Sequence, residues 1–117
     1  MDQRKLKGSQ AELQAQFYLE SLGYRFLTKN YRHGPGEIDL IFLDGKELVF
    51  VEVKFRGSNL YNTALEAVNY LKINKIIRTA EVFMSSNPHL PQSGRIDVIS
   101  IDETKSTPLE HLKNVSI

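Results

Sequence analysis

The sequence contains no cysteine in its 117 residues. This absence excludes a disulfide framework and a thiolate metal site. No apolar run approaches the length that spans a bilayer, and the charged start of the chain is not followed by the apolar segment of a secretory signal. We therefore expect a cytoplasmic protein that has no membrane partner.

The sequence also lacks a clear excess of charge of either sign. Its 15 basic and 14 acidic side chains give a formal net charge of +1, whereas nucleic-acid-binding domains usually show a basic excess. Basic residues nevertheless predominate before residue 37, and acidic residues predominate between 37 and 56. An acidic centre beside basic segments suits a metal-dependent site that handles phosphates. The length suits one domain over 1–117, with 1–8 as a flexible basic arm.

The segment 36–56, GEIDLIFLDGKELVFVEVKFR, predicts two strands joined by a tight turn at Asp44-Gly45. Its second half contains an apolar run, LVFVEVKF, which only Glu52 and Lys54 interrupt. The run is rich in valine and phenylalanine, which favours a strand over a helix at this length. Because the run is otherwise continuously apolar, we expect this strand to lie in the centre of a sheet.

Pairing of the two strands brings charged side chains together, because side chains alternate between the faces of a strand. A four-residue loop, 44–47, places Asp39 opposite Glu52, and a two-residue loop places Glu37 there. Either register gathers four charged residues on one face, within reach of a single ion: Glu37, Asp39, Glu52 and Lys54. A three-residue loop would reverse the alternation and remove the cluster.

Two interpretations of this cluster are open. Carboxylates that crowd together repel, and burial adds to the cost unless a cation compensates. The first interpretation is therefore a site for Mg²⁺ or Mn²⁺, which prefer oxygen ligands. The second is a solvated sheet face on which Lys54 forms a cross-strand salt bridge. The apolar surroundings of Glu52 favour the first interpretation.

The run GEIDLI at 36–41, followed by LVFVEVKFR at 48–56, resembles the pattern of the YraN-like family of small bacterial proteins. It is also similar to the active-site hairpin of PD-(D/E)xK nucleases. The resemblance covers most of the chain and implies an α/β fold with a restriction-endonuclease-like core. In that core a central mixed sheet is flanked by helices in the order α-β-β-β-α-β. The implied function is metal-dependent endonuclease cleavage of phosphodiester bonds, with branched or otherwise structured DNA as the expected partner.

The resemblance also implies roles for residues of the hairpin. Asp39, Glu52 and the carbonyl of Val53 would hold Mg²⁺ or Mn²⁺, which would activate water and neutralise charge on the phosphate. Lys54 would orient that water or stabilise the transition state. We expect its ammonium to stay protonated, because acidic ligands surround it. Glu37 would be an outer-shell ligand or would bind a second metal ion.

Glu12 lies in a predicted helix over 9–22 and has two competing roles. Ser9 and Glu12 match a capping box, and Gly23 matches the end of a helix. The resemblance instead places Glu12 beside the metal cluster, as a further catalytic residue.

Four basic residues are candidates for contact with nucleic-acid phosphates: Arg32, Arg56, Lys72 and Lys75. The first lies in a predicted loop, 30–36, beside His33, which is either an exposed side chain or a general base. The two lysines lie on a predicted helix over 63–85, opposite its apolar stripe, on either a solvated face or a phosphate-binding one. The resemblance places Lys72 near the active site. Asp97, in a predicted strand over 95–101, is expected to hold an arginine or to lie on an exposed face.

Three functions are compatible with this sequence. The first is an active endonuclease, and the alternative is a catalytically weak or inactive nucleic-acid-binding module on a nuclease fold. The third is an assembly protein, which predicts no salt-dependent affinity for nucleic acid, whereas the first two require it. The oligomeric state is open, because a homodimer suits paired cuts in a junction and a monomer suits nicking.

Overall fold

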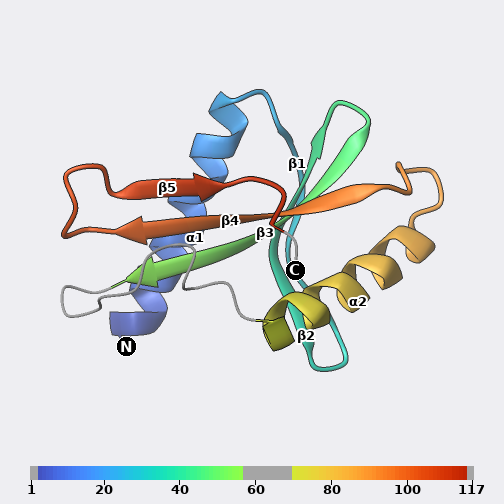
Figure 1. Cartoon of the computed structure of the whole chain (residues 1–117), viewed down its shortest axis with the longest axis horizontal. Helices are drawn as coiled ribbons and strands as arrows, with labels where there is room; N and C mark the ends of the chain where they lie inside the picture. The colour runs from blue at the N-terminus through green and yellow to red at the C-terminus, as the bar shows by residue number, and fades with distance from the viewer. Residues whose placement is uncertain (1–2, 57–69, 116–117) are drawn as a thin grey trace.

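The computed structural model of the chain describes residues 3–56 and 70–115 (Figure 1). Its elements are α1 (Gln3–Ser21), β1 (Arg25–His33), β2 (Gly36–Asp44), β3 (Glu47–Arg56), α2 (Tyr70–Ser86), β4 (Gly94–Asp102) and β5 (Leu109–Leu112). The strands form one sheet in the order β1-β2-β3-β4-β5, in which β3 and β4 are parallel and the other neighbours are antiparallel. The predicted mixed sheet with a central β3 is confirmed, and β5 extends the predicted order by one strand.

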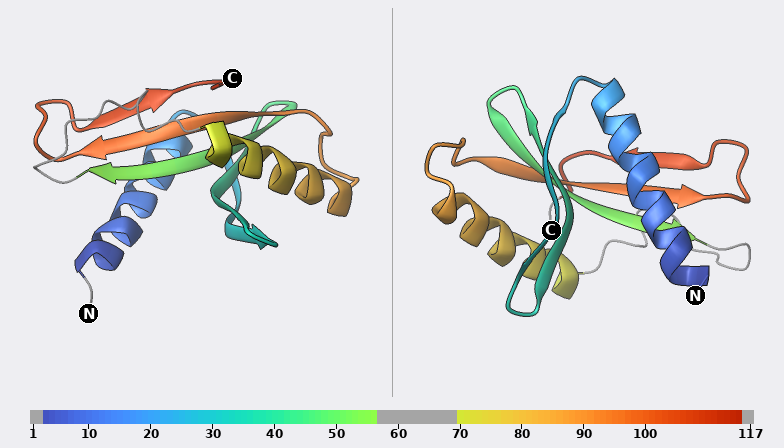
Figure 2. Two further views of the ribbon diagram at one scale, coloured as in Figure 1. Left: turned by 60° about the horizontal axis from the view of Figure 1, so that its bottom comes forward. Right: turned by 180° about the vertical axis from the view of Figure 1, so that it is seen from behind.

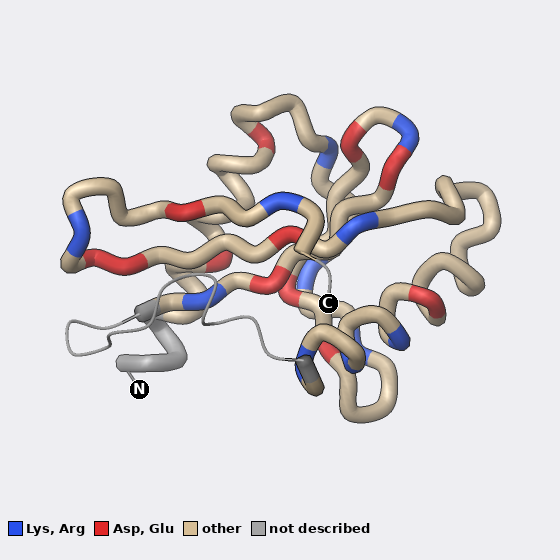
Figure 3. Tube along the Cα trace, viewed as in Figure 1, with Lys and Arg blue, Asp and Glu red and all other residues tan. Residues whose placement is uncertain are grey.

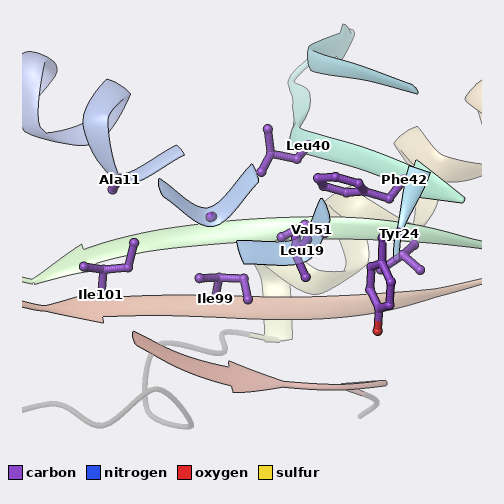
Figure 4. Packing of buried hydrophobic residues seen from close by; sticks show 10 residues of the cluster. Ala11, Leu19, Tyr24, Leu40, Phe42, Val51, Ile99 and Ile101 are labelled. Atoms are coloured by element: carbon purple, nitrogen blue, oxygen red, sulfur yellow. The ribbon is translucent and has the colours of Figure 1, made fainter. Parts of the chain in front are cut away.

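The sheet separates two apolar cores, because alternate residues of β3 point to opposite faces. On one face Val49 and Val51 pack against α1, which contributes Ala11, Ala15 and Leu19 (Figure 4). On the other face Leu48 and Phe50 pack against α2, which contributes Ile73, Ile76, Ala80 and Phe83. The next residue of the second set along β3 is Glu52, so the apolar face that meets α2 ends in a carboxylate.

The turn between β2 and β3 fixes the register of the hairpin. Asp44 pairs with Glu47, which leaves the two-residue loop Gly45-Lys46, and the positive φ of Gly45, 63°, suits a glycine in such a turn. The loop therefore lies one position later than the Asp44-Gly45 turn of the prediction. Leu40 pairs with Val51, and this is the predicted register in which Asp39 comes opposite Glu52.

The strand β2 separates from β3 at its N-terminal half. Pairing of β2 with β1 continues to Gly36, but its pairing with β3 is described only as far as Leu40 and Val51. Figure 2 shows the β1–β2 hairpin leaving the plane of the other strands beyond this point. Ile38 packs in the core beside α2 whereas Leu40 packs in the core beside α1, so the strand twists at the residue between them. We call this point of separation, after Leu40 and Val51, the fork.

Close contact between β2 and α2 explains the glycine that opens the GEIDLI motif. A Cβ atom on Gly36 would overlap the side-chain hydroxyl of Thr79 and would lie 3.3 Å from the backbone carbonyl oxygen of Lys75. Thr79 is itself buried and donates its hydroxyl to that carbonyl at 2.8 Å. The helix therefore rests directly on the backbone at the start of β2, four residues before Leu40.

The structure corrects three boundaries. The helix α1 begins at Gln3, so Ser9 lies inside it; the capping box is wrong, and residues 3–8 belong to the helix and not to an arm. The strand β1 extends to His33, because it pairs with β2 along its whole length, so Arg32 and His33 lie on a strand and not in a loop. The part of the predicted second helix before Tyr70 lies outside the described residues. Neither helix of the described segments is long and apolar enough to cross a membrane.

Candidate active site

The carboxylate of Asp39 occupies the fork. Its Oδ2 atom accepts a hydrogen bond from the backbone N–H of Val53 at 2.8 Å, so a side chain of β2 takes the place of the strand pairing that stops at Leu40 and Val51. A residue in an extended strand points its N–H and C=O to the same side. The carbonyl of Val53 therefore also faces the fork, next to the carboxylate.

Asp39 and Glu52 form a buried pair of acids. The Glu52 side chain is 8% exposed. Burial, followed by the negative charge of Glu52, raises the pKa of Asp39 from 3.8 to about 7, although the hydrogen bond from Val53 acts in the opposite direction. Two ionised carboxylates so close together repel each other where water is partly excluded, so ionisation of Asp39 is disfavoured unless a cation binds beside it.

Two lysines face this acidic pair, one from β3 and one from α2. The Nζ atom of Lys72 lies 3.1 Å from Oε1 of Glu52. Burial, and then contact with Lys72, lowers the pKa of Lys54. For Lys72, contact with Lys54 and with Glu52 outweighs the effect of burial and raises the pKa. The prediction that acidic neighbours decide the charge of Lys54 was therefore incomplete, because it did not include the neighbouring ammonium of Lys72.

Glu12 approaches the same cluster from α1. Burial, followed by the charges of Asp39 and Glu37, raises the pKa of Glu12, and Lys29 partly offsets this effect. This electrostatic contact agrees with a position beside the hairpin acids. The competing role of Glu12 in a helix cap is excluded, because Glu12 lies in the middle of α1.

Glu37 does not join Asp39 and Glu52 around one point. Its Oε2 atom lies 3.3 Å from Nε of Arg32 on the neighbouring strand. Within residues 3–56 and 70–115, no group of three or more His, Asp or Glu side chains is placed to hold a single metal ion. The described geometry therefore does not gather Glu37, Asp39 and Glu52 around one ion. The reason is the separation of β2 from β3, which directs Glu37 toward β1. A role for Glu37 at the site stays a prediction.

The predicted phosphate-binding residues lie on three elements, β1, β3 and α2. The Arg32 side chain is 74% exposed, Lys75 is exposed one turn beyond Lys72 on α2, and His33 is exposed at the end of β1. Arg56 is the last residue of β3, and its side chain lies outside the described part of the structure. Figure 3 shows acidic and basic positions gathered at the centre of the molecule, between β3 and the start of α2.

A second polar cluster lies at the opposite end of the hairpin and includes a residue that sequence analysis missed. Arg95 donates hydrogen bonds to Asp97, Asp44 and Glu47 at 2.9–3.1 Å, which confirms that Asp97 holds an arginine. The missed residue is His111 on β5, whose Nε2 lies 2.8 Å from Oδ2 of Asp97. No sequence motif connects the two, because β4 and β5 bring them together only in the folded sheet.

Comparison with known proteins identifies the family. A statistical description of the uncharacterised protein family UPF0102 matches residues 11–101, which include every element from most of α1 to β4. The chain belongs to the UPF0102 family. The predicted membership of this YraN-like group is thereby confirmed.

Several UPF0102 proteins from distant bacteria are similar to this chain over most of their length. One from Marinomonas sp. (strain MWYL1) is 39% identical over 99 residues, covering 85% of this chain and 78% of the relative. One from Chlorobium phaeobacteroides (strain BS1) is 40% identical over 114 residues, covering 92% and 90%. One from Persephonella marina is 37% identical over 109 residues, covering 93% and 91%. The UPF0102 name states no activity, so the residues of the site are the basis for a proposed function.

Proposed function

We propose that this UPF0102 protein is a metal-dependent endonuclease that hydrolyses phosphodiester bonds of structured DNA. The observation that carries the proposal is the convergence of Asp39, Glu52 and the Val53 carbonyl at the fork, with Lys54 on the same strand. Buried acids with a raised pKa are costly for stability and are concentrated at functional sites. A purely structural role does not require two carboxylates to share this position.

The donor set at the fork fits a hard divalent cation. Two carboxylates and one backbone carbonyl supply oxygen ligands, which Mg²⁺ and Mn²⁺ prefer, and Mg²⁺ usually keeps several waters and takes one or two protein carboxylates. Burial, and then the charge of Glu52, raise the pKa of Asp39, and a cation bound at the fork would favour the ionised form of this carboxyl. The residues that would hold the ion are Asp39, Glu52 and Val53, while Glu12 and Glu37 are outer-shell candidates.

The residues of the chain divide the reaction among them. A divalent cation at this site supplies Lewis acidity, which lowers the pKa of water and offsets charge on the phosphate. The pKa of Lys54 is lowered, so two roles are open to it. The neutral amine accepts a hydrogen bond or a proton from the attacking water. The protonated ammonium stabilises the negative charge on the phosphate oxygens. Lys72 and Arg32 lie on either side of the fork, where they bind the flanking phosphates of the strand.

A cleavage assay tests this proposal. Supercoiled plasmid and branched oligonucleotide DNA are incubated with the wild type, Asp39→Asn and Glu52→Gln, in Mg²⁺ or Mn²⁺ and in a chelator. We expect the wild type to cleave only with the metal, and Asp39→Asn and Glu52→Gln not to cleave in any condition. Glu20→Gln removes an exposed carboxylate of α1 and serves as the matched control that retains activity. Full cleavage by either site variant would refute the assignment.

One observation favours the alternative function, a nucleic-acid-binding module without appreciable cleavage. The ion pair between Lys72 and Glu52 already neutralises one of the two carboxylates, so the site has a partner for its charge in the protein itself. The two functions differ in their requirement for metal. If the wild type binds DNA with a salt-dependent affinity but no metal permits cleavage, the binding module is the better description.

A further inference from the structure

The ion pair between α2 and β3 occupies the position that a cation would need. The ammonium of Lys72 lies 3.1 Å from Oε1 of Glu52, and a Mg²⁺ ion bound to that oxygen would lie about 2.1 Å from it. Both cations would then lie within a few ångströms of each other in a partly buried site, where like charges repel more strongly than in water. The two cations therefore compete for the same carboxylate.

We propose that Lys72 is an internal counter-ion that holds Glu52 until a divalent cation binds, and is then released to bind a phosphate of the nucleic acid. This inference rests on the function proposed above, because it concerns the same carboxylate. It adds a step that the assignment of a metal site does not contain. Binding of the cation and binding of the polyanion become linked through the position of one side chain.

The two partners of the ion pair differ in their freedom to move. Glu52 is 8% exposed and belongs to the central strand, whereas the Lys72 side chain is 43% exposed and projects from the described start of α2. The backbone of α2 is held against β2 by the contact between Thr79 and Gly36. Release of Lys72 therefore requires only rotation of a flexible side chain, while the helix and the carboxylate remain in place.

The direction of release follows from the surroundings of the pair. Lys54 and Glu52, both on β3, contact Lys72 from the sheet, and the Lys72 side chain is otherwise 43% exposed. Lys75 is exposed one turn further along α2, so a released Lys72 would lie beside a second basic residue on the outer face of the helix. Two adjacent ammonium groups attract an anion, and a phosphate diester is such an anion.

Titration calorimetry with Mn²⁺ alone tests the competition without any need for catalysis. The variants of the 117-residue chain are Lys72→Met, which removes the charge, Lys72→Arg, which keeps it, and Lys75→Met as the matched control. We expect Lys72→Met to bind Mn²⁺ at least about tenfold more tightly than the wild type, because the competitor is gone. Lys72→Arg and Lys75→Met should bind with nearly unchanged affinity.

Each other outcome of the titration is decisive. Equal affinity of the wild type and Lys72→Met would overturn the competition and leave the metal site itself intact. An equal gain in Lys75→Met would reduce the effect to general charge and would also overturn the inference. Absence of Mn²⁺ binding in both the wild type and Lys72→Met would reject the proposed metal site together with the competition.

Fluorescence anisotropy with a labelled branched oligonucleotide tests the release. Affinity is measured in a chelator and in Ca²⁺, which also takes oxygen ligands. If Lys72 is held by Glu52 until the cation arrives, Lys72→Met should weaken binding several-fold in Ca²⁺ and hardly at all in the chelator. Equal weakening in both conditions would show that Lys72 contacts phosphate permanently, and no weakening in either would show that it does not contact phosphate. Both results contradict the release.

Discussion

Replacement of Asp39 by asparagine should make the metal-free protein more stable, and more so as the pH rises. Burial and the charge of Glu52 raise the pKa of this carboxyl from 3.8 to about 7. The native protein therefore binds a proton that the unfolded chain has already lost. Stability from this group is fully present below about pH 4 and falls as the pH rises through 7, because ionisation in the folded state is costly. Asparagine cannot ionise and can still accept the hydrogen bond from the N–H of Val53.

The size of the effect follows from the shift in pKa. At 1.36 kcal/mol for each pKa unit, complete ionisation of the buried carboxyl costs at most about 4 kcal/mol. Because the positive charge of Lys72 lies nearby and favours the ionised form, part of this cost is compensated. We expect Asp39→Asn to gain about 2 kcal/mol in free energy of unfolding at high pH.

Urea denaturation in the presence of a chelator measures this gain. The free energy of unfolding of the wild type, Asp39→Asn and the exposed-site control Glu20→Gln is determined at about pH 4.5 and about pH 8.5. The advantage of Asp39→Asn over the wild type should be larger at the higher pH, while any effect of Glu20→Gln should be the same at both. A destabilised Asp39→Asn, or an advantage that does not change with pH, would show that the carboxyl is not held in an unfavourable position.

Three further predictions concern the rest of the molecule. Addition of Mn²⁺ at about 100 times its dissociation constant should raise the free energy of unfolding of the wild type by about 2.7 kcal/mol. The melting temperature of Asp39→Asn/Glu52→Gln should not change when Mn²⁺ is added. An equal rise in both proteins would mean that the ion binds elsewhere. Gly36→Ala should lower the free energy of unfolding by roughly 1–3 kcal/mol, because the added Cβ meets Thr79. An unchanged free energy of unfolding in urea denaturation would show that the contact is loose. His111→Ala should cost roughly 1–3 kcal/mol, because it removes a partner of the buried Asp97; a denaturation midpoint equal to that of the wild type would contradict this.

The elements that the sequence predicts well depend on local rules. Alternation within one strand places Glu52 and Lys54 on the same face, and the turn at Gly45 sets the register that brings Asp39 opposite Glu52. These inferences need only neighbouring residues. The order of strands and helices follows in the same way from the spacing of apolar runs and turns.

The remaining features depend on contacts between distant parts of the chain. The strand β1, which pairs with the twisted part of β2, contains Asn30 with a positive φ of 52°. The alternation of apolar and polar residues in the sequence indicates neither this φ nor the twist. The pairing of Lys72 with Glu52 requires the exact height of α2 over the sheet, which the contact at Gly36 decides. The basic stripe of a helix looks the same in sequence whether it faces water or a carboxylate, so the residues alone do not predict the ion pair of Lys72 with Glu52, although the family resemblance places Lys72 near the site.

The strand β2 is held at its two ends by different neighbours. Arg95, at the start of β4, joins Asp44 and Glu47, which flank the turn between β2 and β3, to the buried Asp97. At the other end α2 rests on Gly36 through Thr79, and Phe83 packs edge-on against Tyr31 of β1. The carboxylate of Asp39 lies between these two supports, at the point where β2 leaves β3. The position of Asp39 relative to Glu52 therefore depends on the sheet on one side and on the seat of α2 on the other.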